Sequence, residues 1–310
     1  MKSIKYTKTE DNTTIIPVKL FNLKYTFESA QPITFYGDLL SDKELKYVDN
    51  KELIHIKYEE NNNKGIIKLF NSDNYKLNNV IKTFGLNENM KTYYKKIVTD
   101  EHLEKAVNLY NGMRLTLNDP WVTTVCFILS QFNNVKRIRK ITKNIIDRYG
   151  VDTIDKGTGI NIKTFPSPEI ISKLTNEELL KCGTGFRSKY LIDAAQVCSE
   201  NIDLYKLNPK NYDSLRENLL SIKGVGLKVA DCIILMGYGN LNAFPIDVWM
   251  KRTMERLYFN SKPQKLKDIY DFSYEKWGKY RGFAQQYLFF YGMKYLGRVD
   301  NNGKREKIKN

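Results

Sequence analysis

A lysine and an aspartate, 19 positions apart (247 minus 228), are the residues of this chain best suited to chemistry. Lys228 lies two residues after a Gly-Val-Gly turn, at the start of the apolar run LKVADCIILM, and Asp247 follows in FPIDVW. A helix N-terminus favours anions because its backbone dipole is positive there, so a lysine at this point needs a solvated exit or a chemical role. In its neutral form, which a low-dielectric pocket favours, a lysine amine is a nucleophile.

An amine and a carboxylate together suit the cleavage of an acetal. The amine can attack C1′ of a deoxyribose, and the carboxylate can stabilise the positive charge that develops on the sugar as the base leaves. Lys228 would take the first role and Asp247 the second. The competing interpretation of Asp247 is a helix N-cap, which is the common use of an aspartate before a run such as VWMKRTMERLY.

The elements that must position these residues form a predicted helix, hairpin and helix near residues 213–237. SLRENLL and LKVADCIILM are the two helices, and IKGVG is the turn. In that turn Gly224, Val225 and Gly226 can present consecutive backbone N–H groups to a phosphate, a contact that carries no base sequence information. The alternative is an ordinary helix-to-helix turn capped by a glycine.

The composition limits the partners and cofactors. The 310 residues carry a net charge of +15, which favours a polyanion such as nucleic acid, although an AT-rich genome could supply much of the lysine. The chain has no apolar run of membrane-spanning length and no secretory signal, so we expect a cytoplasmic protein. Four dispersed cysteines and two histidines predict neither a zinc site nor an iron–sulfur centre.

The pattern of the whole chain predicts an α+β protein. Alternation in FNLKYTFE (residues 21–28) indicates a strand, and residues 53–70 read as a β-hairpin. We therefore predict an antiparallel β domain over residues 1–95 and a helical domain over residues 96–300. A basic tail follows at 301–310. Within the helical domain, Asp119-Pro120 and a Thr175–Glu178 capping box predict helix starts.

The segment GVGLKVADC followed by FPIDVW resembles the helix-hairpin-helix (Gly/Pro-Asp) DNA glycosylase superfamily, and residues 18–295 are most similar to its 8-oxoguanine DNA glycosylase/AP lyase family. The resemblance implies that Lys228 is the nucleophile and Asp247 the essential aspartate. It implies base removal from double-stranded DNA, then a Schiff base and a nick by β-elimination. It further implies a monomer that needs no cofactor, with a cation site formed by carbonyls of the hairpin turn.

The stretch NGMRLTLNDPWVTTVCFILSQFNNVKRI resembles the family segment that ends in an Asn-Asn-Asn loop, which fills the gap left by the extruded base. Here Phe132 replaces the first asparagine and precedes Asn133 and Asn134. An aromatic ring at that position would fill the gap by stacking. Arg137 stands where the family has an arginine that reads the partner base.

GTGFRSKY resembles the wedge segment of the same family. Phe186 occupies the intercalating position and Arg187 lies beside it. Together with Arg137, Arg187 favours a cytosine partner, because arginine is a good hydrogen-bond donor to bases.

The base pocket implied by the resemblance contains Gln285, Phe289, Cys232, Ala30 and Trp249. Gln285 and Phe289 lie four residues apart on one helix face, and a glutamine amide can pair with the Watson–Crick edge of a purine. Phe289 and the Cys232 sulfur would sandwich the ring, and because these positions resemble those where the family holds its base, the resemblance implies 8-oxoguanine as the substrate. Ala30 stands at the glycine whose carbonyl accepts the extra N7 hydrogen, so discrimination against guanine is expected to differ.

Two alternatives remain open from the sequence. One is a glycosylase of the same superfamily that acts on alkylated purines or on a broad range of bases, although such enzymes typically lack the lysine. The other is a noncatalytic helix-hairpin-helix DNA-binding protein.

Overall fold

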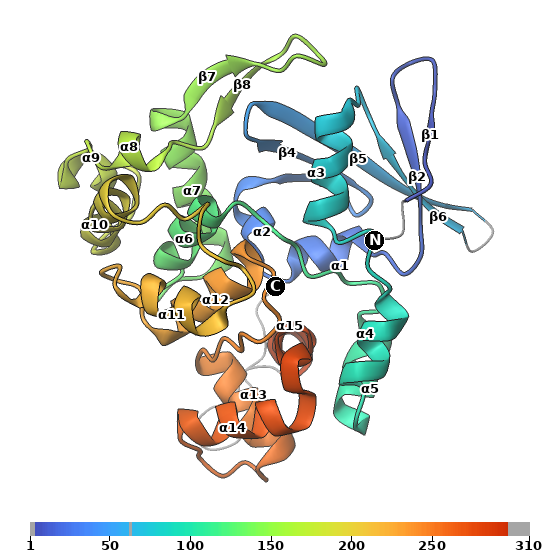
Figure 1. Ribbon diagram of the computed structural model, residues 1–310, viewed down its shortest axis with the longest axis vertical. Coiled ribbons are helices and arrows are strands. Elements are labelled where there is room, and N and C mark those ends of the chain that lie inside the picture. The colour runs from blue at the N-terminus through green and yellow to red at the C-terminus, as the bar shows by residue number, and fades with distance from the viewer. Residues whose placement is uncertain (1–3, 62–63, 297–310) are drawn as a thin grey trace.

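The computed structural model describes residues 4–61 and 64–296 and places a six-stranded antiparallel sheet in the N-terminal part of the chain (Figure 1). The strand order is β1-β2-β6-β5-β4-β3. The strands are β1 (Thr7–Lys8), β2 (Thr14–Val18), β3 (Asp38–Ser41), β4 (Glu44–Asp49), β5 (Glu52–Asn61) and β6 (Lys64–Leu69). The predicted antiparallel sheet and the 53–70 hairpin are therefore confirmed.

One face of the sheet forms a hydrophobic core with a helix. Ile54 and Ile56 on β5 are fully buried and alternate with the partly exposed Leu53, His55 and Lys57. Leu77 and Val80 of α3 (Asn74–Thr83) belong to the same core, and Figure 1 shows α3 lying across the sheet. Burial of one face explains why this part of the sequence alternates.

The strand predicted over residues 21–28 is wrong, because this segment contains helix α1 (Leu23–Glu28). The Asn22 side chain caps α1 by accepting a hydrogen bond from the Tyr25 N–H at 2.9 Å. Leu23, Thr26 and Phe27 are buried, which is the spacing of one helix face. In so short a segment the apolar residues satisfy both periods, and the cap decides between them.

The rest of the chain is mainly helical, and the predicted helix starts are confirmed. Asp119, Thr175 and Asp247 each cap a helix with their side chains, and Thr175 forms the predicted capping box with Glu178. A short hairpin of β7 (Val151–Ile154) and β8 (Asn161–Thr164) interrupts the helices. The helices are α2 (Pro32–Tyr36), α4 (Met90–Ile97), α5 (Glu101–Leu109), α6 (Pro120–Leu129), α7 (Val135–Tyr149), α8 (Pro168–Ile171), α9 (Asn176–Leu180), α10 (Arg187–Glu200), α11 (Tyr212–Leu220), α12 (Leu227–Gly237), α13 (Val248–Tyr258), α14 (Leu266–Trp277), the 3-10 turn η1 (Gly278–Tyr280), α15 (Arg281–Tyr291) and the π-helical turn η2 (Gly292–Leu296).

The helices form two hydrophobic cores. One surrounds α6 and α12, and the other joins α4 and α5 to α13, α14 and α15, at the opposite end of the molecule from the sheet (Figure 1). The predicted domain boundary at residue 95 falls inside α4. The predicted basic tail, residues 301–310, lies outside the described residues.

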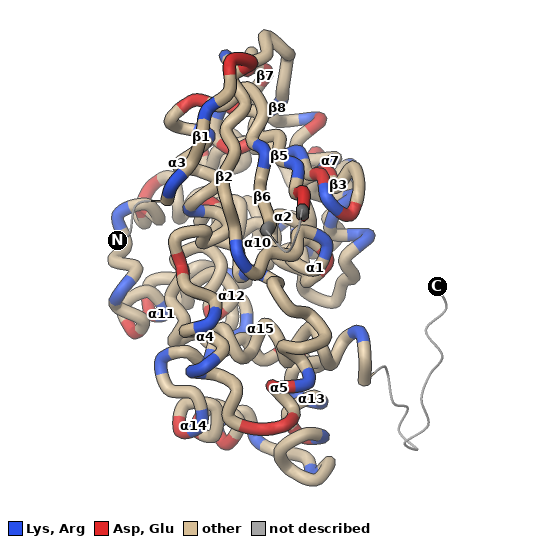
Figure 2. Tube along the Cα trace, turned by 90° about the vertical axis from the view of Figure 1, so that its right-hand side faces the viewer, with Lys and Arg blue, Asp and Glu red and all other residues tan. Residues whose placement is uncertain are grey.

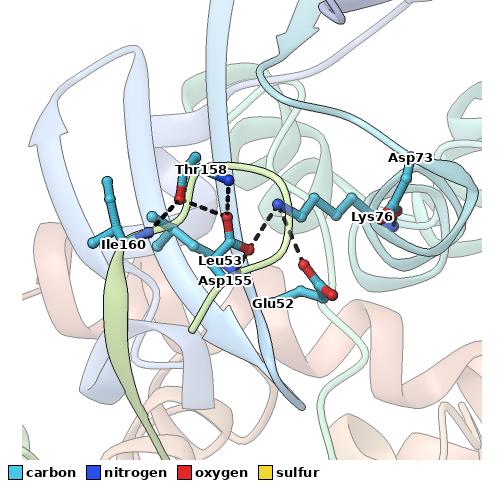
Figure 3. Close-up of polar contacts among 7 residues, drawn as sticks. All are labelled: Glu52, Leu53, Asp73, Lys76, Asp155, Thr158 and Ile160. Carbon is cyan, nitrogen blue, oxygen red and sulfur yellow. Dashed lines mark hydrogen bonds and ion pairs between the residues drawn. The ribbon is translucent and has the colours of Figure 1, made fainter. Parts of the chain in front are cut away.

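A buried ion pair fastens the β7–β8 hairpin to the sheet. The Lys76 ammonium of α3 donates to Asp155 Oδ1 at 2.8 Å and lies 3.4 Å from Glu52 Oε2 (Figure 3). Asp155 also accepts hydrogen bonds from the Leu53 N–H, at 2.8 Å, and from the Thr158 N–H and hydroxyl. Burial alone would raise the pKa of Asp155, but the hydrogen bonds from Lys76 and Thr158 hold it well below its usual range.

The charges are spread over many elements. Figure 2 shows lysines and arginines on strands and helices alike, with acidic residues between them. Across residues 4–61 and 64–296, no helix is long and apolar enough to cross a bilayer.

Candidate active site

The predicted helix, hairpin and helix are present as α11, a turn and α12. Gly224 has φ of +86°, and a Cβ there would lie 2.6 Å from the Tyr190 ring, so the close packing of α10 requires glycine. Gly226 is the N-cap of α12, and a Cβ there would meet no atom of the protein within 4 Å. The turn is therefore packed on one side and open on the other, where the first N–H groups of α12 can meet a ligand.

Lys228 lies in the first turn of α12 and is held against α6. Its Nζ donates to the Ser130 hydroxyl at 3.2 Å and sits 5.1 Å from the centroid of the Phe127 ring. The side chain is half-buried. The Phe127 ring and the Ser130 hydroxyl thus hold the Lys228 ammonium at the helix N-terminus, so the side chain packs against the protein and does not extend into solvent. Ser130 and Phe127 could not be predicted as partners of Lys228, because they lie about 100 residues away in the chain.

Cys232, one turn after Lys228, is acted on by the charges of both Lys228 and Asp247. Burial raises the pKa of the Cys232 thiol to about 12, while the Lys228 charge lowers it and the Asp247 charge raises it. Both charged groups therefore lie near the thiol. The fold brings these three predicted residues together from α12 and from the start of α13.

Asp247 is the N-cap of α13, as the structural interpretation of the sequence predicts. Its Oδ1 accepts a hydrogen bond from the Met250 N–H at 2.7 Å, and its side chain is half-buried. The cap fixes the orientation of the carboxylate. Capping thus positions the aspartate, whose charge acts on the Cys232 thiol. Trp249, in the first turn of α13, is also half-buried.

Gln285 is attached to the segment that leads into Asp247. Its Nε2 donates to the Pro245 carbonyl at 3.1 Å, and the side chain is only 4% exposed. Its Oε1 is buried without a hydrogen-bond partner in the described part of the chain. A buried polar atom without a partner is costly, so this oxygen is suited to accept a hydrogen bond from a ligand. Phe289, on the next turn of α15, is half-buried.

Ala30 has the backbone conformation expected where the family has glycine. Its φ is +57°, in the left-handed region. The carbonyl of the preceding residue, Ser29, accepts a hydrogen bond from Gln286 Nε2 at 2.8 Å, which attaches this segment to α15. Gln286 was missed by sequence reasoning. The signal was available, because a second glutamine on a largely apolar helix also needs a buried partner.

The loop after α6 exposes one aromatic side chain. Phe132 has φ of +47° and is 95% exposed. Asn133 and Asn134 have local structural roles, because Asn133 Nδ2 donates to the Leu129 carbonyl and the Asn134 side chain caps α7 by accepting from the Arg137 N–H. Arg137 itself is exposed.

The turn before α10 exposes a second aromatic side chain. Phe186 is 53% exposed, and its ring centroid lies 6.4 Å from that of Phe132. Arg187 is only 2% exposed, and it donates to the carbonyls of Gln131, Phe132 and Thr184. The structure therefore brings the two predicted wedge segments together.

The aromatic pair and the lysine belong to one continuous site. Gln131 Nε2 donates to the Gly224 carbonyl of the hairpin turn at 3.0 Å, and its neighbour Ser130 accepts from Lys228. Among the residues that the structure describes, no group of three His, Cys, Asp or Glu side chains could hold a metal ion. The groups available for chemistry are an amine, a carboxylate and a buried amide beside an open hairpin turn.

Comparisons with known proteins agree with this arrangement. Residues 125–279 match the family described as HhH-GPD superfamily base excision DNA repair protein. The chain is 28% identical over 230 residues to a probable N-glycosylase/DNA lyase of Methanothermobacter thermautotrophicus, covering 66% of this chain and 71% of that one. It is 30% identical over 246 residues to the N-glycosylase/DNA lyase of Saccharomyces cerevisiae, covering 68% and 65%.

The fold also matches a solved protein–DNA complex. That complex contains the Clostridium acetobutylicum 8-oxoguanine glycosylase/lyase bound to double-stranded DNA with cytosine opposite 8-oxoguanine. The two chains are 29% identical with a TM-score of 0.83, and the match covers 94% of this chain and 98% of that one. The family model and the site geometry agree, and the chain belongs to the HhH-GPD superfamily of base excision DNA repair proteins.

Proposed function

We propose that this protein removes 8-oxoguanine from double-stranded DNA and then cuts the strand at the resulting abasic site. The observation that carries the proposal is the placement of Lys228. The amine lies at the open turn of the hairpin, where it contacts Ser130 and Phe127. The charges of Lys228 and Asp247 both act on the Cys232 thiol. Relatives called N-glycosylase/DNA lyase and the similar 8-oxoguanine complex support it.

The reaction follows from these two groups. Lys228 loses a proton, and its amine forms a bond to C1′ while the bond between C1′ and the base breaks. Asp247 stabilises the positive charge that develops on the sugar. Opening of the sugar gives a Schiff base, removal of a C2′ proton follows, and the bond from C3′ to its oxygen breaks. The base takes up a proton as it leaves, and hydrolysis of the Schiff base by water finally frees Lys228 and releases a strand nicked on the 3′ side of the lesion.

The extruded base would be held on the wall formed by α12 and α15. The unpartnered Gln285 Oε1 can accept from the Watson–Crick edge of the purine, and Phe289 and Cys232 can flank the ring. The left-handed backbone at Ala30 supports the proposal that its carbonyl accepts the N7 hydrogen of 8-oxoguanine, because that position keeps the conformation of a glycine. Trp249 completes the proposed pocket.

The hairpin turn and the positive surface charge, +15 in total, are proposed to bind DNA phosphates. Affinity for duplex DNA should then fall steeply as the salt concentration rises. An affinity that does not change with salt would contradict the proposed phosphate contacts. A cation at the turn, a monomeric state and a cytoplasmic location stay predictions.

The substrate is tested by single-turnover base release from matched duplexes containing 8-oxoguanine, an alkylated purine or uracil. We expect release of 8-oxoguanine. Strong release of the alkylated purine with none of 8-oxoguanine would replace the proposal by alkylation repair. Binding without release of any base, and without nicking of abasic DNA, would indicate a noncatalytic DNA-binding protein.

A further inference from the structure

Two consecutive glutamines attach α15 to two separate segments of the chain. Gln285 Nε2 donates to the Pro245 carbonyl at 3.1 Å, in the loop before α13. Gln286 Nε2 donates to the Ser29 carbonyl at 2.8 Å, directly before Ala30. In each glutamine the Oε1 atom is buried without a hydrogen-bond partner in the part of the chain that the structure describes. Adjacent residues of one helix therefore hold both segments.

Packing alone does not explain an amide at position 286. Gln286 is only 1% exposed, and an apolar side chain of the same size would fill this space without leaving a buried oxygen unpaired. The atom that faces the Ser29 carbonyl must be the nitrogen, because two oxygen acceptors would repel each other. The useful group of this side chain is therefore its donor, and the target of the donor is Ser29.

The Ser29 carbonyl matters because the next residue has an unfavourable backbone conformation. Ala30 is the single residue between Ser29, the C-cap of α1, and Gln31, the N-cap of α2. Its φ of +57° lies in the left-handed region, which is costly for an alanine because of its Cβ and is open to a glycine. Such a conformation persists only where the surrounding structure holds it.

Ala30 is held from both sides. On one side the Gln31 side chain is fully buried, and its Nε2 donates to the Arg114 carbonyl at 2.8 Å and to the Ser29 hydroxyl at 2.9 Å. On the other side the Ser29 carbonyl and the Ala30 N–H belong to one planar peptide unit, so the hydrogen bond from Gln286 fixes that unit. Gln286 thus links the left-handed backbone to α15.

We propose that Gln286 is a positioning residue for base specificity, which holds the left-handed Ala30 backbone against α15 and so fixes the separation between two contacts to the base. One contact is the Ala30 carbonyl at the N7 edge, and the other is Gln285 at the Watson–Crick edge. The inference rests on the proposed function, since these groups meet a base only if the enzyme binds 8-oxoguanine. Guanine lacks the N7 hydrogen, so the placement of the Ala30 carbonyl separates the two bases.

The first test removes the donor. Gln286→Met keeps the volume of the side chain and lets the Ala30 backbone leave the left-handed region, which an L-residue disfavours about 5- to 30-fold. Single-turnover release of 8-oxoguanine from a duplex should slow by about that factor, whereas nicking of a preformed abasic site, which has no base, should keep the wild-type rate. Unchanged release of 8-oxoguanine by the folded variant would overturn the proposal.

The variant should fold, because the loss of the bond to Ser29 and the removal of an unpartnered oxygen act on stability in opposite directions. Gln286→Leu, which also lacks polar groups, takes its place if it does not. The matched control is Tyr287→Phe, which removes a buried hydrogen bond to the Met113 carbonyl, 2.7 Å long, and should slow neither reaction. Equal slowing of 8-oxoguanine release by Tyr287→Phe would assign the effect to the packing of α15 and would overturn the proposal.

The second test is rescue by glycine. Because glycine adopts positive φ readily, Ala30→Gly should restore 8-oxoguanine release by Gln286→Met towards the wild-type rate. The same change should not restore Gln285→Leu, because that variant lacks the contact to the Watson–Crick edge. A role of Gln286 in packing alone predicts no rescue, so failure of Ala30→Gly to restore release would overturn the proposal.

A measurement on the free protein separates this inference from the proposed function. Hydrogen exchange of the backbone amides in residues 23–36 should be faster in Gln286→Met than in the wild type and in Tyr287→Phe. Unchanged exchange would show that Gln286 does not hold this segment and would overturn the inference while the proposed function stands. Absence of 8-oxoguanine release by the wild type would defeat the proposed function and the specificity role with it, and exchange would still decide whether Gln286 anchors Ala30.

Discussion

Replacing Gln285 by leucine should separate base recognition from all other steps. The Gln285 amide is 4% exposed, with Nε2 on the Pro245 carbonyl and Oε1 buried without a partner within the described residues. Leucine has a similar volume and removes both polar groups. The variant therefore tests whether the unpartnered oxygen is reserved for a base.

The expected magnitudes differ for stability and for activity. Leaving the buried Pro245 carbonyl without its donor costs about 1–3 kcal/mol, and removing a buried oxygen without a partner recovers about 1–3 kcal/mol, so the free energy of unfolding should change little. In the complex with 8-oxoguanine, the same change leaves a base donor unpaired in a dry pocket. That costs about 1–3 kcal/mol, which corresponds to base release about 5- to 150-fold slower.

The assay compares two substrates with one preparation of each protein. Single-turnover base release is measured on an 8-oxoguanine duplex, and strand nicking is measured on a duplex with a preformed abasic site. Gln285→Leu should slow only the first reaction, because the abasic site has no base to hold. Equal slowing of both reactions, or none of either, would refute the proposed role of Gln285.

Two further predictions concern stability and DNA contact. Asp155→Asn leaves the buried Lys76 ammonium without its nearest carboxylate and should lower the free energy of unfolding by about 3–5 kcal/mol in urea titrations, whereas the exposed Asp152→Asn on the same hairpin should cost less than about 1 kcal/mol. Because the folded-state pKa of Asp155 is lowered, its stabilisation is full above the unfolded pKa of about 4 and shrinks as the pH falls further, so the two proteins should converge in acid; a pH-independent difference would contradict the ion pair. Gly226→Val should fold normally, since a Cβ there meets no protein atom within 4 Å, yet weaken duplex binding measured by fluorescence anisotropy; unchanged affinity would mean that the turn does not approach a phosphate.

Much of the fold followed from local signals. The predicted hairpin, the capping box at Thr175 and the caps at Asp119 and Asp247 depend on residues within a few positions of each other. The strand predicted over residues 21–28 was wrong because it also rested on a local signal. Six helical residues fit period 2 as well as period 3.6, and only the Asn22 cap distinguishes the helix from the strand.

The site was predicted as a set of residues but not as a network. Lys228 and Asp247 were expected to act together and Cys232 to line the base pocket, and in the structure the charges of both residues act on the Cys232 thiol. The partners Ser130 and Phe127, and the buried Lys76 and Asp155 pair, join segments about 80 to 100 residues apart. No periodicity encodes such contacts. The engagement of Arg187 with loop carbonyls was unpredictable for a related reason, since backbone acceptors leave no trace in residue types.

The central claim is that the Lys228 amine forms a covalent bond to the sugar. The most direct measurement is borohydride reduction with abasic duplex DNA, followed by mass spectrometry of the protease-digested complex, for the wild type, Lys228→Gln and Asp247→Asn. We expect a DNA adduct on the peptide containing Lys228, no adduct in folded Lys228→Gln, and slower base release with DNA binding retained in Asp247→Asn. An adduct on another amine, or normal trapping by Lys228→Gln, would contradict the account.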